Sequence, residues 1–171
     1  MSRDESASDS KELCVRYFCY TKYLGALNIM LTTQQKNCIQ ETPFGWFTLL
    51  TRKVKISRRV LKELCTRWVE KRGGFFIWFE FVSFSLLDVC VGLGLRVSVI
   101  YVELENGNFD SYCRSLFTCG IVKVKMVFDE LVKCHTDGRV DEFCKLYILL
   151  GLSEFLFPNR MGNVYSGLFN M

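Results

Sequence analysis

The residue types best suited to catalysis gather around one histidine. His135 is the sole histidine of the chain, Cys134 precedes it, and Asp141 and Cys144 follow it. A cysteine peptidase needs a thiolate nucleophile, a histidine base and an acid that orients the base. Neighbours in sequence at a helix end do not by themselves build that geometry, and no peptidase signature surrounds them. We therefore predict no catalytic residue and no enzymatic activity, and interpret His135 as a surface histidine near a helix end.

The same residues could instead ligate zinc, with Cys134, His135 and Cys144 as three ligands and Cys113 or Cys119 as the fourth. Zinc sites usually present their ligands in short pairs, and none of the nine cysteines forms a Cys-x-x-Cys pair. The chain begins MSRDESASDSK, without the apolar run of a secretory signal, so we expect reduced, intracellular cysteines. The sequence predicts neither a metal site nor a disulfide framework.

Two patterns suggest a cofactor, and neither is complete. A pyridoxal phosphate site needs a lysine that forms a Schiff base and an acidic partner for the pyridinium nitrogen, and no lysine here stands in a recognisable context. Gly92 and Gly94 suggest a dinucleotide loop, but the third glycine is missing and the pair follows a helical pattern, not a strand. We expect no cofactor and no small-molecule substrate.

A basic cluster is the feature with the most functional promise. Six cations fall within eleven residues and a seventh follows on the same predicted helix: Arg52, Lys53, Lys55, Arg58, Arg59, Lys62 and Arg67. Such a cluster could contact nucleic-acid phosphates. Glu63 and Glu70 are interleaved with it, and charged outer helix faces are commonly just solvated. Nucleic-acid contact and a solvated helix face both stay open.

Length and composition favour one intracellular globular domain. The chain has 171 residues, 50% of them hydrophobic, and a formal net charge of only +4. Residues 75–101 are strongly apolar, but Glu80, Asp88 and Arg96 interrupt them, so we expect no membrane span. We predict a disordered polar tail over residues 1–12 and one domain over residues 13–171.

The clearest element is a helix that begins after Ser57, a residue suited to the N-cap position. Its apolar stripe has helical spacing and consists of Val60, Leu61, Leu64, Cys65, Trp68 and Val69. The Gly73–Gly74 pair is expected to end this helix. Residues 75–82 are aromatic and unperiodic, which predicts an extended segment.

The remaining elements are mostly helical. Ser85 and Asp88 match a capping box that begins a second helix, with Gly92 or Gly94 at its end. We also predict helices over 14–31 and 111–134, a weak strand over 97–104, a central buried helix over 140–157 and a tight turn over 158–163. The fold class is therefore mainly α, a single helical domain with a small extended or β element. The expected core consists of Leu61, Leu64, Trp68, Leu86, Val89, Phe128, Tyr147, Ile148 and Leu149.

Two ordered patterns resemble the plant mobile domain, also called the aminotransferase-like plant mobile domain. The first joins Leu-x-x-Leu-x-x-Arg-Trp to an aromatic segment and Ser-x-x-Asp-Val-x-x-x-x-Gly-Leu-x-Val, and is carried by Leu61, Leu64, Arg67, Trp68, Phe76, Phe79, Ser85, Leu86, Asp88, Val89, Gly94, Leu95 and Val97. The second lies in FCKLYILLGLSEFLFPNRMGNVYSGLF, and is carried by Tyr147, Leu149, Leu150, Gly151, Leu156, Phe157, Pro158, Gly162 and Asn163. The resemblance covers roughly residues 56–169, and the chain stops before the family's next tryptophan-containing segment.

The resemblance implies a non-enzymatic nuclear interaction module of transposon-derived plant type, associated with gene silencing and genome maintenance. Protein partners are expected, with no established catalytic residue in the domain. The segment FSLLDVCVGLGLRV also resembles a branch of this family that precedes ubiquitin-like (SUMO-type) cysteine peptidase domains. An accessory region of such a peptidase is therefore one alternative, and a nucleic-acid-binding module that uses the basic cluster is another.

Overall fold

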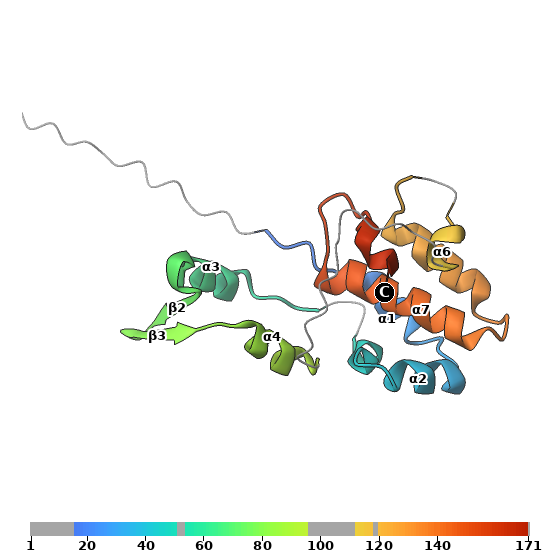
Figure 1. The fold of residues 1–171 in the computed structure, drawn as a ribbon, viewed down its shortest axis with the longest axis horizontal. Coiled ribbons are helices and arrows are strands. Elements are labelled where there is room, and N and C mark those ends of the chain that lie inside the picture. Colours follow the sequence, from blue (N-terminus) through green and yellow to red (C-terminus); the bar gives the residue numbers. More distant parts are fainter. Residues whose placement is uncertain (1–15, 51–53, 96–111, 118–119, 171) are drawn as a thin grey trace, which may run out of the picture. The chain divides into compact units, whose positions relative to one another are not determined.

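The computed structural model describes residues 16–50, 54–95, 112–117 and 120–170 (Figure 1). Helices dominate these residues, and a single small antiparallel sheet of order β1-β2-β3 is described among them. The prediction of a mainly α fold with a small β element is confirmed. The described residues divide into two compact units, which we describe separately: unit 1 comprises residues 16–17 and 56–84, and unit 2 comprises the described residues of 18–55 and 85–170.

Unit 1 is a short helix followed by a three-stranded sheet. Its elements are α3 (Arg58–Arg67), β1 (Trp68–Val69), the 3-10 turn η2 (Glu70–Arg72), β2 (Gly74–Ile77) and β3 (Glu80–Ser83). Ser57 caps α3 as predicted, because its hydroxyl accepts the backbone N–H of Val60 at 3.4 Å. The prediction that this helix continues to the glycine pair is wrong. The helix ends at Arg67, because the next two residues pair with Phe75 and Gly74 in the sheet.

The sheet is held by aromatic contacts on one face. Trp68 pairs with Phe75, and their ring centroids lie 4.9 Å apart; Phe84 lies 5.7 Å from Phe75. Trp68 nevertheless stays 41% exposed, so its predicted place in the core is wrong. The edge position of β1 leaves one side of the indole without a neighbouring strand. At Gly74 a Cβ atom would lie 2.3 Å from the carbonyl oxygen of Val82, so the strands can pair this closely only with glycine there.

Helix α4 (Leu86–Leu93) begins with the predicted capping box. The Asp88 carboxylate accepts the backbone N–H of Ser85 at 2.7 Å, and the Ser85 hydroxyl accepts the N–H of Asp88 at 3.4 Å. Hydrogen bonding to Ser85, first through its hydroxyl, lowers the pKa of Asp88. Gly94 ends the helix at φ +66°, as a C-terminal glycine should. Leu86 is 65% exposed, so its predicted core position is wrong: it occupies the first turn of α4, where Ser85 and Asp88 are also exposed.

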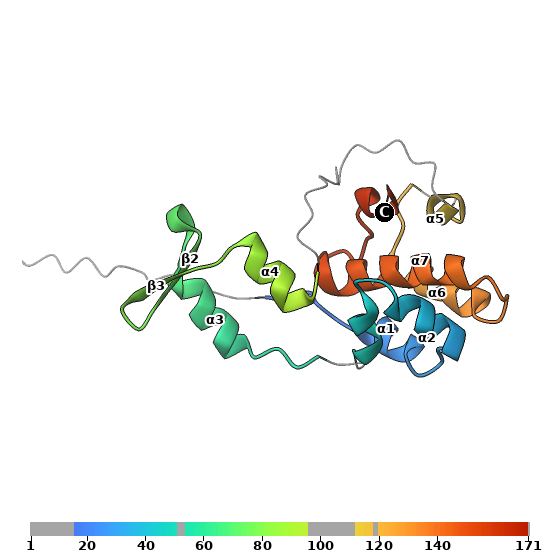
Figure 2. The ribbon, with the colours of Figure 1, turned by 60° about the horizontal axis from the view of Figure 1, so that its bottom comes forward.

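Unit 2 is a helical assembly around one buried helix. Its other elements are α1 (Lys22–Leu27), α2 (Thr33–Gln40), η1 (Gly45–Leu49), α5 (Tyr112–Ser115), α6 (Val124–Cys134), α7 (Val140–Gly151), the π-helical turn η3 (Leu152–Leu156) and η4 (Ser166–Asn170). Figure 2 shows α6 beside α7, and α7 also contacts α1, α2 and α5. The prediction of a central buried helix is confirmed: Tyr147 and Leu149 are buried, and Phe128 and Ile148 pack against the same core.

Two predicted helices are shorter than expected. The pattern over 14–31 yields only α1 within the described residues, and the pattern over 111–134 yields α5 and α6 with a break between them. The break has a physical cause. Residues 122–124 pair with 162–164, through Val164 N–H to the Val122 carbonyl at 2.8 Å and Val124 N–H to the Gly162 carbonyl at 2.9 Å. The Val122 carbonyl and the Val124 N–H are used in this pairing, so they cannot serve a helix that runs continuously through residues 122–124.

Several predictions lie outside the described residues, namely the tail 1–12, the strand 97–104, Arg52 and Lys53. In the parts of the chain that are described, no helix has the length and apolar character needed to cross a bilayer.

Candidate functional site

The cysteines and the histidine singled out above do not share one arrangement. The His135 Nε2 atom lies 2.6 Å from the carbonyl oxygen of Met30, and the imidazole ring meets Phe143 edge-on at 6.0 Å. The Cys134 thiol lies 3.7 Å from the Glu130 carboxylate, whereas the Cys144 thiol donates to the Gln35 carbonyl at 3.7 Å. Each thiol thus faces an acceptor on a different element.

The electrostatics at both thiols oppose a nucleophilic role. Burial raises the pKa of Cys134, and the Glu130 carboxylate raises it further. Burial also raises the pKa of Cys144, with smaller effects from Cys38 and Asp141. A reactive cysteine instead has a lowered pKa, which produces thiolate at neutral pH. Within the described ranges no three His, Cys, Asp or Glu side chains are placed to hold a metal ion, and Cys119 lies outside those ranges.

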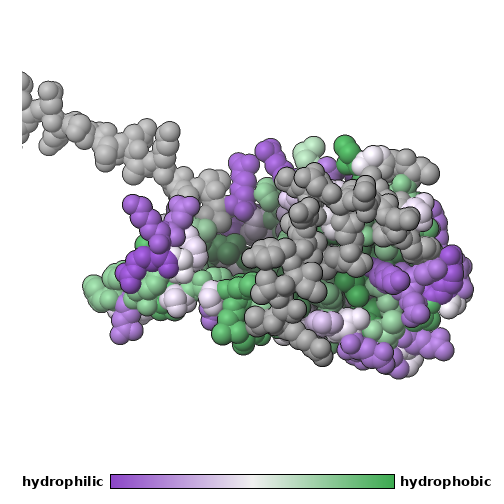
Figure 3. Space-filling model, viewed as in Figure 1, coloured by the Kyte–Doolittle hydropathy of each residue, from purple (hydrophilic) through white to green (hydrophobic). Residues whose placement is uncertain are grey.

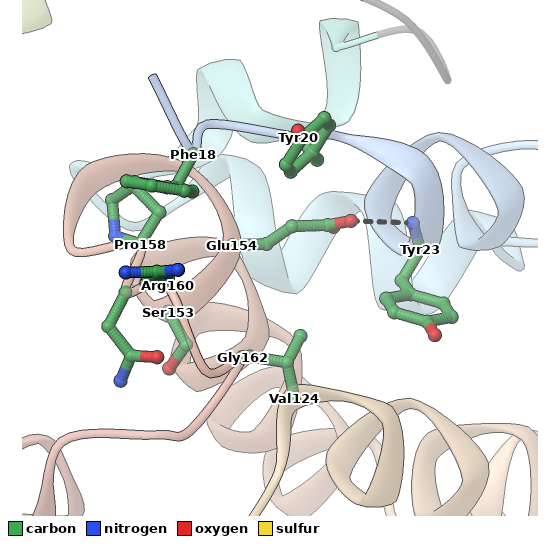
Figure 4. Close-up of a pocket in the computed structure, with 10 residues that line it drawn as sticks. Phe18, Tyr20, Tyr23, Val124, Ser153, Glu154, Pro158, Arg160 and Gly162 are labelled. Carbon is green, nitrogen blue, oxygen red and sulfur yellow. Dashed lines mark hydrogen bonds between the residues drawn. The ribbon is translucent and has the colours of Figure 1, made fainter. Parts of the chain in front are cut away.

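A buried carboxylate that the sequence reasoning missed lies in unit 2. Glu154, in η3, is only 5% exposed, and its two oxygens accept the backbone N–H groups of Tyr23 and Leu24, each at 2.9 Å. These donors belong to the first turn of α1, so the carboxylate caps that helix (Figure 4). It borders a cavity of about 180 Å³ lined in part by Tyr20 and Arg160. Because both oxygens already serve α1, we interpret Glu154 as structural.

The ionisation of Glu154 predicts a pH dependence. Burial raises the pKa of this carboxyl above its ordinary value, against the opposing effect of the backbone donors. The folded chain therefore keeps a proton at pH values where the unfolded chain has released it, so stability falls as pH rises from about 4.3 through the folded-state pKa. We expect the wild type to lose stability relative to Glu154→Gln over that window, measured as urea midpoints between pH 4 and pH 7. If the stability of the wild type minus that of Glu154→Gln stayed constant or rose with pH, this assignment would be contradicted.

The most unusual backbone lies at the tip of the β2–β3 hairpin in unit 1. Ile77 pairs with Glu80, which leaves Trp78 and Phe79 as a two-residue turn with φ values of +51° and +70°. Two-residue turns with positive φ at both positions strongly favour Asn-Gly. Bulky residues in this region cost on the order of 1–3 kcal/mol each. The side chains gain no burial in return, because they are 87% and 94% exposed.

Basic and aromatic side chains meet beside this tip. Arg67, at the end of α3, lines one cavity of about 350 Å³ together with Phe76, Trp78 and Phe79. Arg67 also forms an exposed ion pair with Glu63 at 3.3 Å. On the sheet, Phe76 pairs with Phe81, and the Arg72 guanidinium lies 3.9 Å from the Phe81 ring centroid.

Most of the basic cluster is exposed where it is described. Arg58 and Arg59 are exposed in the first turn of α3, Lys62 is half-buried, and Lys55 is exposed just before the unit. Residues 56–84 hold six cations and three carboxylates, a formal net charge of +3. Figure 3 shows hydrophilic side chains beside hydrophobic ones over these elements. The candidate site combines the cations of α3 with the hairpin tip, and Arg67 is the α3 cation that lines the cavity with the rings. We call this set of residues the basic-aromatic face and define it as Arg58, Arg59, Lys62, Arg67, Phe76, Trp78 and Phe79.

The structure brings the predicted Arg67 together with three aromatic residues that were predicted only as an extended segment. The positive charge was visible in sequence, whereas the turn was not, because Trp-Phe is not a turn-forming pair. Comparison of the chain with protein-family models, with curated proteins and with solved structures found no match.

Proposed function

We propose that this chain is a non-enzymatic nuclear interaction module of plant mobile-domain type, and that it contacts chromatin by binding nucleic-acid phosphates on the basic-aromatic face. The resemblance of its two sequence patterns supports the family and the nuclear setting. The observation that carries the binding surface is the hairpin tip: two large aromatic side chains are held in an unfavourable turn and left exposed, beside Arg67 at the end of α3. Strain without a packing benefit is typical of residues kept for contact with another molecule.

The cations of α3 supply a sequence-independent contribution to binding. Arg58 and Lys62 are one helical turn apart, and Arg59 is adjacent to Arg58, so the three can reach neighbouring phosphates along one backbone. Glu63 sits next to Lys62 but is paired with Arg67, which reduces its repulsion of an approaching anion. Binding of this kind should weaken steeply as salt rises.

A charge reversal tests the proposal. We expect Arg58→Glu/Arg59→Glu/Lys62→Glu to weaken binding of a duplex DNA fragment strongly at 100 mM salt, and to lower the slope of log affinity against log salt by about three. The measurement is fluorescence anisotropy of a labelled 20-base-pair duplex titrated with the full chain between 50 and 200 mM salt.

The matched control reverses three exposed cations of unit 2 instead, in Lys36→Glu/Lys123→Glu/Lys145→Glu. It changes the net charge equally and should keep most of the duplex affinity and the wild-type salt slope. If both triple variants lost the same duplex affinity, the loss would be explained by overall charge and not by the position of the α3 cations. Unchanged retention in the α3 variant would exclude the basic-aromatic face as the binding surface.

A further inference from the structure

From the geometry of the hairpin tip we propose that the basic-aromatic face binds single-stranded nucleic acid in preference to duplex, with Trp78 and Phe79 stacking on unpaired bases. This inference rests on the proposed function, since the α3 cations hold the phosphates in both cases. It adds the class of nucleic acid and the residues that select it.

The tip offers two aromatic faces without competition from the protein. Trp78 and Phe79 follow each other directly and are 87% and 94% exposed, so each ring is free to contact a planar ligand. Successive bases of a single strand stack on such side chains regardless of sequence, because every base has a π-face. In a duplex the bases are already stacked on one another, and these faces are closed to the protein. Exposed adjacent rings therefore distinguish the two forms.

The surroundings of the tip suit a nucleic-acid strand. Arg67 lines the same cavity as Trp78, Phe79 and Phe76, which places a guanidinium beside the rings where a phosphate or a base can meet it. On the face of the sheet that Phe76 shares with Phe81, Arg72 adds a second guanidinium over the Phe81 ring. Rings alternating with cations are the arrangement by which single-strand binders follow a backbone.

An anionic membrane is the other ligand that aromatic and basic residues could suit, and the tip argues against it. Glu80 follows Phe79 directly and is exposed, so burying the tip among lipid chains would bring a carboxylate with it. A nucleic-acid strand needs only the ring faces and leaves Glu80 in water. The observations therefore favour nucleic acid.

The test replaces the tip with the turn that the backbone prefers. Trp78→Asn/Phe79→Gly supplies the favoured pair for positive φ, so we expect the variant to melt no earlier than the wild type. Its affinity for a labelled oligo(dT) of twelve nucleotides should fall roughly 10- to 100-fold in anisotropy titrations of the full chain at 100 mM salt. Duplex affinity should fall by a smaller factor than oligo(dT) affinity, so the preference for oligo(dT) should be lost, and the salt slope should persist because the α3 cations are intact.

A second pair of variants separates stacking from simple apolar contact. Trp78→Leu/Phe79→Leu keeps the tip apolar but removes both π-faces, and should lose oligo(dT) binding as the Asn-Gly variant does. Trp78→Tyr/Phe79→Tyr keeps both rings and should retain most of the affinity. The same proteins are titrated with vesicles of phosphatidylcholine and phosphatidylserine, which the wild type should not bind.

Each outcome decides between the two proposals. Oligo(dT) binding that survives in the Asn-Gly or the Leu-Leu variant overturns the stacking inference and leaves the proposed function standing. Wild-type binding to duplex with no preference for oligo(dT) does the same. Failure of the wild type to bind either nucleic acid overturns both proposals, and binding to vesicles alone assigns the tip to lipid instead.

Discussion

Replacing Phe47 with alanine should lower the free energy of unfolding of unit 2 by about 3–5 kcal/mol. Phe47, in η1, is completely buried, and its ring lies 4.5 Å from that of Trp46 and 5.5 Å from that of Phe44. Its far side rests on α7 at Gly151. Truncation therefore leaves a cavity between two elements that cannot both collapse into it. Urea unfolding of the full chain followed by far-ultraviolet circular dichroism measures the loss.

The partner of this ring gives the control. A Cβ atom at Gly151 would lie 2.3 Å from Cε2 of Phe47, closer than any real contact, so Gly151→Ala should cost about 1–3 kcal/mol by overpacking. Phe47→Ala removes the three ring atoms that clash, so Phe47→Ala/Gly151→Ala should be more stable than the sum of the single losses by about 0.5–3 kcal/mol. Additive losses would show that the ring and α7 are not in contact as described.

The elements that were predicted well are those in which local pattern and tertiary burial agree. Residues 146–157 are apolar apart from Ser153 and Glu154, and only the interior of unit 2 can accommodate such a segment, so its central position followed from composition. The Ser85–Asp88 capping box is a purely local hydrogen-bond arrangement, and it forms as the spacing indicates.

The errors arise where pairing between distant residues competes with local pattern. Trp68 and Val69 continue the helical stripe of α3, yet they pair with Phe75 and Gly74 because backbone pairing with β2 competes with one further helical turn. The break before α6 has the same origin, since residues 122–124 pair with 162–164. Periodicity alone carries no information about a partner strand.

The candidate site was half visible in sequence for a related reason. Charge is a property of residue type, so the cations of α3 could be found without a structure. The turn at Trp78 and Phe79 depends on φ values that these residues rarely adopt. The sequence has no glycine or asparagine at these positions from which a turn could be predicted. Because Trp78 and Phe79 are residues that disfavour positive φ, this turn could be found only in the structure. The same mismatch between residue type and backbone conformation is the reason to assign a function to the exposed rings.

Glu154 was missed although one sign of it was present: it is the sole charged residue in the apolar run from Leu146 to Phe157. Glu154→Ala should lower the free energy of unfolding by about 2–4 kcal/mol, because the N–H groups of Tyr23 and Leu24 lose their acceptors and Leu24 is fully buried. Glu154→Gln keeps one acceptor oxygen and should lose less. Equilibrium urea unfolding of the two variants measures both values.

A substitution at the neighbouring Ser153 tests whether Glu154 stabilises the fold by capping α1 or only by filling space in the π-helical turn. Ser153 is as buried as Glu154, but its hydroxyl bonds only to the Leu149 carbonyl at 2.7 Å, within its own helix. That carbonyl also accepts the backbone N–H of Leu152, so Ser153→Ala should cost less than about 1 kcal/mol. Amide exchange provides a second readout, since Glu154→Ala should release Tyr23 and Leu24 while Ser153→Ala leaves both protected. Equal losses in the two variants would mean that packing in η3, and not the capping of α1, accounts for the burial of this carboxylate.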